Sequence, residues 1–125
     1  MGELQIKRIY EQEDPSDGYR ILVDRLWPRG MSKVRADLAD WDKQVAPTSE
    51  LRRRFHDGEL SYEEFRDAYD KELADNPAYD ELVKLVAGRL SEGNVTLLFG
   101  SKDETENNAE VLLELLRKSL GRQAD

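Results

Sequence analysis

The chain has 125 residues, and 19 Lys and Arg residues against 27 Asp and Glu residues give it a formal net charge of −8. It has no cysteine and a single histidine, His56, which excludes disulfide scaffolds, thiolate zinc sites, cysteine nucleophiles and His-rich metal centres. A membrane-spanning apolar run and a signal-peptide pattern are both absent, and the net negative charge argues against general affinity for nucleic acid. We therefore expect one cytoplasmic domain, residues 1–125, with no metal and no cofactor.

Three segments have the pattern of β-strands. In residues 4–10, Leu4 and Ile6 alternate with Gln5 and Lys7 and Ile9 follows, which indicates a strand. Residues 19–23 and 95–99 contain continuous apolar runs, as expected of strands covered on both faces. The turn-forming residues 14–18 precede the second strand, and Pro28 and Gly30 follow it, so that strand is sharply bounded.

Helical spacing dominates the middle of the chain. Leu38, Trp41 and Val45 share one helical face before Pro47, and a further helix follows Pro47. A capping box at Ser61 predicts the start of the next helix.

The last two helices have their own start and stop signals. Asn76 and Pro77 begin one that Gly93 closes. The final helix follows residues 101–104 and ends at Gly121, which leaves residues 122–125 as a frayed tail.

This order of elements favours an α/β fold, in which helices pack around a small, mainly parallel sheet. An α+β arrangement, with the first two strands paired as a hairpin, stays open. In the parallel arrangement, the strands at 19–23 and 95–99 are neighbours. Their carboxyl ends then meet at one edge, where open α/β sheets bind ligands.

The charge is unevenly distributed. Residues 20–35 hold five cations against Asp24 alone, a local charge of +4 that leaves −12 for the rest of the chain. Such a segment can bind an anionic ligand, or its arginines can pair with the surplus carboxylates. Both interpretations remain open on the sequence alone.

Two loops follow the strand ends and carry suitable chemistry. Arginine forks bind phosphate or carboxylate, lysine adds a point charge, and glycine allows the backbone to approach a ligand. The candidate ligand-binding residues are Arg25, Trp27, Arg29, Gly30, Gly100, Ser101, Lys102 and Asn107.

Three titratable residues are candidates for proton transfer: Asp24, His56 and Asp103. Each candidate residue also has a structural interpretation. Asp24 can pair with Arg25, Trp27 can fill the core, and Ser101 and Asn107 can cap a turn or a helix.

Residues 17–30, with the sequence DGYRILVDRLWPRG, and residues 96–103, TLLFGSKD, resemble the YeaO-like family of small bacterial proteins of unknown function. The similarity also covers residues 40–43 and 47–52 and therefore spans nearly the whole chain. It implies a cytoplasmic single domain and no established activity. Family members often have a histidine beside the asparagine equivalent to Asn107, whereas the neighbours here are Glu106 and Asn108.

The leading hypothesis is that a strand-end crevice binds a small anion, such as a nucleotide, a phosphoester or a carboxylate, with or without catalysis. One alternative is a non-enzymatic protein-interaction module that uses its acidic helices and carries an apolar patch on residues 61–92. A further alternative is nucleic-acid binding through residues 20–35 and 52–54. A monomer or a small homo-oligomer is compatible with each hypothesis.

Overall fold

The strands of the computed structural model are β1 (Leu4–Arg8), β2 (Tyr19–Leu22), β3 (Asp40–Trp41) and β4 (Val95–Phe99). The helices are α1 (Lys33–Ala36), α2 (Ser49–His56), α3 (Tyr62–Ala74), α4 (Pro77–Leu90) and α5 (Asn108–Ala124). Residues 2–124 are described, the last three of them by their backbone alone.

The four strands form one parallel sheet in the order β1-β4-β2-β3. The predicted α/β class is therefore confirmed, and so is the parallel pairing of the strands at 19–23 and 95–99. The hairpin alternative is wrong because β4 lies between β1 and β2. Arg8 is opposite Phe99 and Leu22 is opposite Leu98, so three strands end side by side.

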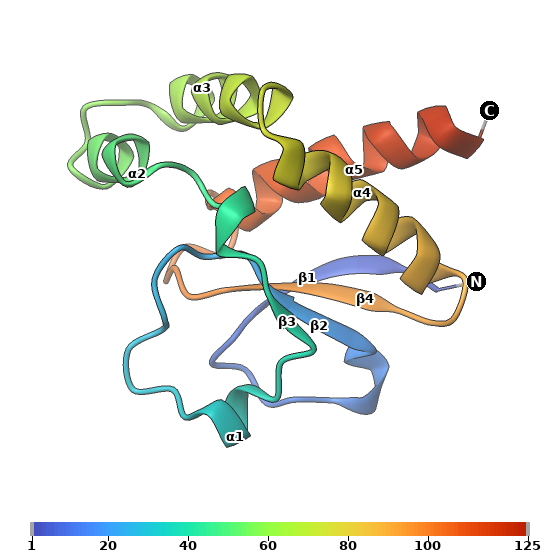
Figure 1. The fold of residues 1–125 in the computed structure, drawn as a ribbon. Helices are drawn as coiled ribbons and strands as arrows, with labels where there is room; N and C mark the ends of the chain where they lie inside the picture. The colour runs from blue at the N-terminus through green and yellow to red at the C-terminus, as the bar shows by residue number, and fades with distance from the viewer. Residues whose placement is uncertain (1, 125) are drawn as a thin grey trace.

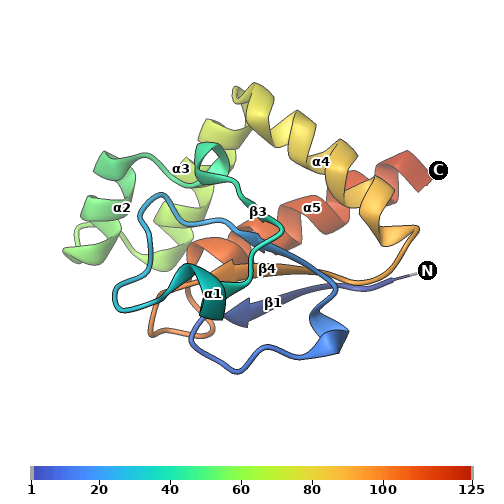
Figure 2. The same cartoon turned by 60° about the horizontal axis from the view of Figure 1, so that its bottom comes forward.

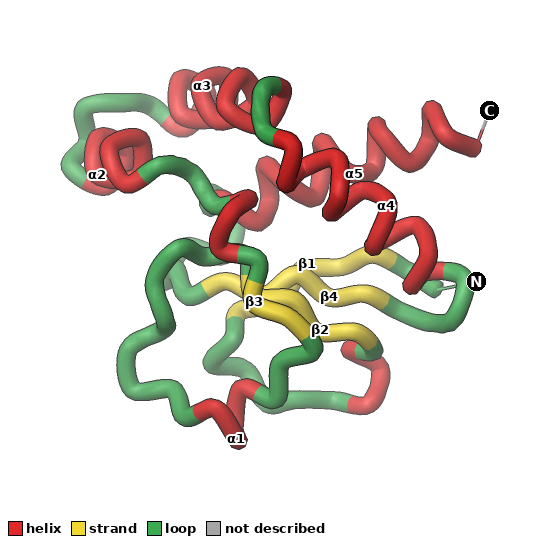
Figure 3. Tube along the Cα trace, viewed as in Figure 1, coloured by secondary structure: helices red, strands yellow, loops and turns green. Residues whose placement is uncertain are grey.

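Both faces of the sheet are covered (Figures 1 and 3). Helices α2 to α5 lie over one face, where Ile21 and Leu97 join the main core. The chain between β2 and β3, including α1, covers the other face, where Leu22 and Leu98 pack with Met31. Neighbouring side chains of β2 and β4, such as Ile21 and Leu22 or Leu97 and Leu98, alternate between these two cores, which explains the continuous apolar runs.

The helix predicted over Leu38, Trp41 and Val45 is wrong. Asp37 ends α1 in the left-handed conformation, with φ of 43°. The backbone then pairs with β2: Ala39 N donates to Arg20 O and Asp42 N donates to Leu22 O, both at 2.9 Å. These bonds make residues 40–41 the edge strand β3. Backbone pairing with the sheet therefore determines the structure here, although the spacing of the three apolar residues is that of a helix.

The capping box at Ser61 and the N-cap at Asn76 are confirmed. Two predicted helix ends are wrong. Helix α4 ends at Leu90, and Gly93 is not among the glycines with positive φ. Helix α5 continues through Gly121 to Ala124, since an exposed glycine reduces helix stability without ending the helix. Residue 125 of the predicted frayed tail lies outside the described residues.

Gly18, just before β2, is one glycine that the fold requires. Its φ is 65°, and an added Cβ would lie 2.1 Å from the carbonyl oxygen of Asn94. We expect G18A to lower the free energy of unfolding by at least about 1 kcal/mol, measured by urea denaturation. The matched control is G88A in α4, where no atom lies within 4 Å of the added Cβ and a gain of about 0.5–1 kcal/mol is expected. Equal stability of G18A and the wild type would contradict this account.

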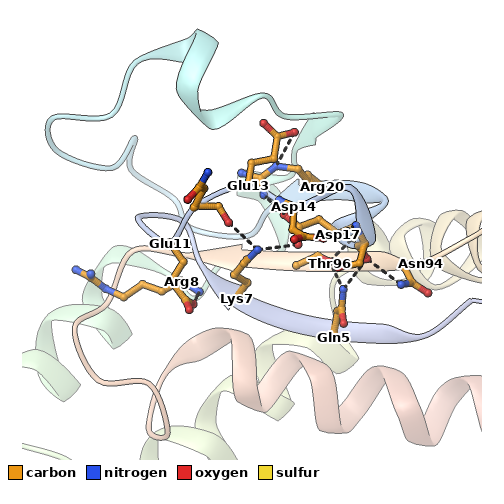
Figure 4. A network of polar contacts seen from close by, with 12 residues as sticks. Gln5, Lys7, Arg8, Glu11, Glu13, Asp14, Asp17, Arg20, Asn94 and Thr96 are labelled. Atoms are coloured by element: carbon orange, nitrogen blue, oxygen red, sulfur yellow. Dashed lines mark hydrogen bonds and ion pairs between the residues drawn. The ribbon is translucent and has the colours of Figure 1, made fainter.

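A buried polar network fixes the start of β2 (Figure 4). Asp17 Oδ2 accepts a 2.5 Å bond from Arg20 Nη1, and its Oδ1 accepts a 2.8 Å bond from Lys7 Nζ. The Nε and Nη2 groups of Arg20 also donate to Ala36 O, at 3.1 and 2.8 Å. Arg20 thus has the structural role that the ion-pairing interpretation of the cationic segment predicted.

Candidate ligand-binding site

A cavity of about 720 Å³ lies at the carboxyl edge of the sheet. It is bounded by the loops after β2 and β4, by α2 and by the start of α5, which lie on the side toward which the strands point (Figure 2). Each residue predicted for the site lines this cavity, with the exception of Gly30. Gly30 instead makes the predicted bend, with φ of 75° and open space around it.

Asp24 follows β2 and is held by neutral donors from two other elements. Its Oδ2 accepts a 2.8 Å bond from Gly100 N, and its Oδ1 accepts a 3.1 Å bond from Asn108 Nδ2. Burial raises the pKa of the Asp24 carboxyl above its usual value, although these two bonds and the nearby Arg52 act in the opposite direction. The raised pKa shows that burial outweighs the bonds that stabilise the charge.

The raised pKa predicts how stability depends on pH. A carboxyl whose pKa is higher in the folded state favours folding most when it is protonated, and this contribution is lost as the pH rises through the folded pKa. We therefore expect D24N to become more stable relative to the wild type between about pH 3 and pH 7. Urea denaturation across this range measures the difference, and a constant or falling difference would refute the assignment.

Arg25 does not pair with Asp24. Its Nε donates to Pro47 O at 3.1 Å, and its Nη2 donates to Ala46 O at 3.2 Å. These bonds fix the half-buried guanidinium against the segment that precedes α2, so Arg25 presents its charge to the cavity from a fixed position.

Three further cations line the cavity: Arg29, Arg52 and Lys102. All three are exposed, and none belongs to an ion pair between residues that the structure describes. Arg52 nevertheless lies near enough to Asp24 for its charge to act on the pKa of that carboxyl.

Arg8, the last residue of β1, and Tyr10, two residues further on, fix the loops that carry Arg29 and Lys102. Tyr10 Oη donates to Arg29 O at 2.7 Å, and Arg8 Nε donates to Ser101 O at 2.9 Å. The Arg8 guanidinium also lies over the Tyr10 ring, 4.5 Å from its centroid. The end of β1 thus links the loop after β2 to the loop after β4.

The loop after β4 is longer than the sequence indicated, since α5 begins at Asn108. Asp103 Oδ1 accepts bonds from the backbone N–H groups of Thr105 and Glu106, which lower the pKa of the Asp103 carboxyl. Ser101 Oγ accepts a bond from Asp103 N, and the buried Asn107 caps α5 by accepting a bond from Glu110 N at 2.8 Å. These side chains stabilise turns before the helix starts, as their structural interpretation predicted.

Aromatic side chains form part of the cavity wall. Trp27 donates from Nε1 to Met31 O at 2.7 Å and meets Trp41 edge to face, with ring centroids 5.3 Å apart. Phe55 stacks on Phe65 with centroids 4.4 Å apart. Trp27 therefore packs in the core and also lines the cavity.

His56 is the exposed last residue of α2. It lines the cavity with Asp24 and Asp103, but no hydrogen bond between described residues joins any two of these three. Nor do three His, Asp or Glu side chains gather as metal ligands anywhere in the described part of the chain.

Several residues of this cavity, among them Arg52 and Asn108, were not among the predicted site residues. Arg52 belongs to an arginine triplet, a pattern that is typical of a solvated helix face. Its spacing of four residues from His56 was the available signal, because it places both side chains on one side of α2. The side chain of Asn108 donates to both Val23 O and Asp24 Oδ1, and no local pattern predicts so distant a partner.

Fold and cavity together define a small α/β protein with a cation-lined cavity at the strand ends. The sequence profile of a family described as the inactive DUF488-N3 subclade matches residues 3–125. The chain is 44% identical over 114 residues to the uncharacterized protein YeaO of Escherichia coli (strain K12). These 114 residues cover 91% of this chain and 96% of that protein. The chain is 38% identical over 113 residues to uncharacterized proteins of Mycobacterium tuberculosis and Mycobacterium bovis, covering 90% of this chain and 92% of each of them.

The chain belongs to this family of YeaO-like proteins, so the resemblance seen in the sequence is confirmed. No solved structure matches it. Within the described residues, every helix is too short or too polar to cross a lipid bilayer.

Proposed function

We propose that this protein binds a small anion, such as a phosphoester, a nucleotide or a carboxylate, in the strand-end cavity. One observation carries the proposal: Arg25, Arg29, Arg52 and Lys102 line the same cavity, and no ion pair between described residues includes any of them. The chain has 27 acidic residues with which to neutralise its 19 cations. Asp24, Asp103 and Glu106 also line the cavity, and the charge of Arg52 acts on Asp24. None of these carboxylates forms an ion pair with the four cations, so the unpaired cations favour an external anion as a partner.

The geometry of the cations suits such a ligand. Arg25 uses Nε and Nη2 for backbone carbonyls, which leaves Nη1 without a bond to any described residue. A guanidinium already fixed in this way loses little further freedom when it binds an oxyanion. Arg29 and Lys102 lie on loops that the end of β1 holds in place, so they are also partly preorganised.

Binding without turnover is the form of the proposal that we favour. The family is described as inactive, and the candidate proton-transfer residues are not hydrogen-bonded to one another within the described structure. The carboxylate of Asp103 also stabilises a turn, because its Oδ1 accepts hydrogen bonds from the backbone N–H groups of Thr105 and Glu106. A general acid or base requires a pKa near the working pH, and the lowered pKa of Asp103 moves away from it.

The other two hypotheses have less support. An interaction module that uses the acidic helices predicts an apolar patch on residues 61–92. The large hydrophobic side chains exposed among the described residues are Leu26 and Val34, both outside that range. For nucleic-acid binding, Arg20 of the cationic segment 20–35 is buried and paired with Asp17, so it is not available to contact a phosphate backbone.

Substitution of one exposed cation tests the proposal. We expect R29A to weaken the binding of pyrophosphate about tenfold or more, since a charge-assisted hydrogen bond contributes about 1.5–3 kcal/mol. Isothermal titration calorimetry at fixed ionic strength measures the affinity. The matched control is R53A, which removes the same charge from an arginine outside the cavity and should change the affinity less than about twofold. Equal losses in both variants would overturn the proposal.

A further inference from the structure

Resting on the proposed function, we infer that the ligand carries hydroxyl groups next to its anionic group, as a phosphorylated polyol or sugar does, and that a hydroxyl donates to Asp24. The cations of the cavity bind the anionic group of such a ligand. Asp24, a carboxylate that lies among those cations, binds a different part of the ligand, its hydroxyl group.

The hydrogen bonds of Asp24 leave it able to accept more. Each carboxylate oxygen has two acceptor positions, and each oxygen of Asp24 accepts one bond, from Gly100 N or from Asn108 Nδ2. Both donors are neutral, and no ion pair within the described structure includes Asp24. Acceptor positions therefore remain on a carboxylate that lines the cavity.

Gly100 shows how closely the backbone approaches this carboxylate. A Cβ added to Gly100 would lie 3.2 Å from Asp24 Oδ2, closer than side-chain atoms ordinarily pack. The glycine therefore allows the backbone N–H to fix the carboxylate, and Asn108 fixes its other oxygen. Two elements that are distant in the sequence thus fix both carboxylate oxygens of Asp24, a residue that lines the cavity.

The charge of Asp24 selects among anions. A bare oxyanion is repelled by a carboxylate in its own cavity, whereas a hydroxyl group donates a charge-assisted hydrogen bond to it. A phosphate with a hydroxyl a few bonds away can place its charge against Arg29, Arg52 or Lys102 and its hydroxyl against Asp24. An ammonium group would also suit Asp24, but the surrounding cations disfavour it.

The rest of the cavity fits such a molecule. Its volume of about 720 Å³ is within the range of small-molecule sites, and a sugar or polyol phosphate occupies only part of it. Trp27 and Phe55 supply apolar wall against which the C–H groups of a polyol can pack.

Two phosphates that differ only in hydroxyl groups test the inference. Glycerol 3-phosphate and propyl phosphate have the same carbon chain, and we expect wild-type protein to bind the first about tenfold more tightly. D24N should lose this preference and bind propyl phosphate at least as well as the wild type does, because the repelling charge is gone. Isothermal titration calorimetry measures the affinities, and the ¹H–¹⁵N resonance of Gly100 should move when glycerol 3-phosphate binds to the wild type.

The outcomes separate this inference from the proposed function. Equal affinities of the wild type for the two phosphates would overturn the hydroxyl requirement while leaving anion binding intact. A tighter complex with phosphoethanolamine would overturn it in favour of an ammonium group, and an unchanged preference in D24N would overturn the role of Asp24. If neither phosphate binds the wild type, the proposed function fails and the inference fails with it. The comparison of two ligands on the wild type does not depend on the folding of any variant.

Discussion

Replacing Asp17 with alanine is expected to lower the free energy of unfolding by about 3–5 kcal/mol, because it leaves a buried charge without its partner. Arg20 is 4% exposed, and the carboxylate of Asp17 neutralises it at 2.5 Å. The carbonyl of Ala36 remains bonded to the guanidinium in the variant, but it supplies no negative charge. Glu13 Oε2 lies 4.0 Å from Arg20 Nε, and because this side chain is 41% exposed it replaces little of the lost attraction. Urea denaturation at pH 7 measures the loss.

The control for D17A is an ion pair at the surface. Arg89 and Glu92 are 3.4 Å apart, with side chains 45% and 69% exposed, so solvent screens their attraction. E92A should change stability by less than about 1 kcal/mol. Similar losses in D17A and E92A would show that the network in Figure 4 does not stabilise the start of β2.

The pair formed by Asp17 and Arg20 predicts that stability depends on pH in the opposite direction to that predicted for Asp24. Burial by itself would raise the pKa of Asp17, but hydrogen bonds from Lys7, from the backbone of Asp14 and from Arg20 lower it on balance. A carboxyl with a lowered folded pKa stabilises the protein above its unfolded pKa, and this contribution is lost as the pH falls through the folded pKa. The destabilisation in D17N should therefore shrink as the pH falls from about 5 to about 2.

The double variant R29A/R52A is expected to weaken pyrophosphate binding by two orders of magnitude or more. Each guanidinium contributes about 1.5–3 kcal/mol to a charge-assisted contact, and 1.4 kcal/mol corresponds to a tenfold change in affinity. Both side chains are exposed and in no ion pair between described residues, so the fold should keep its stability. Calorimetric titration of the folded variant measures the loss.

The control variant R53A/R54A removes the same charge, partly from the same helix. Arg53 and Arg54 pair with Glu59 at 3.3 and 3.4 Å, and neither lines the cavity. A long-range effect of net charge would weaken binding equally in the two double variants. A specific site predicts a large loss in R29A/R52A alone.

Much of the sheet and the place of the cavity could be predicted from local sequence. Apolar runs such as Val95–Phe99 identify buried strands, and polar residues directly after them identify the edge where ligands bind. The edge strand β3 could not be predicted in this way, because its two residues depend on backbone bonds to Arg20 and Leu22. Tertiary pairing there prevails over local periodicity.

The hydrogen-bond partners of the site residues also could not be predicted from the sequence. Asp24 lies next to Arg25 in the chain, yet its partners are Gly100 and Asn108, and Arg25 contacts the segment before α2 instead. Residue type identified the candidates, but the fold determines which of them meet. Arg52 is the clearest case, since its place at the cavity depends on how α2 packs.

Binding of a small anion in the strand-end cavity is tested most directly by a ¹H–¹⁵N titration with pyrophosphate at constant ionic strength. We predict saturable shifts confined to the amides of residues 24–30, 52–56 and 100–108, which surround the cavity. The amide resonances of α4, a helix with no residue in the cavity lining, should not shift and serve as the internal control. Shifts that do not saturate, or that spread evenly over all exposed cations, would contradict binding in the cavity.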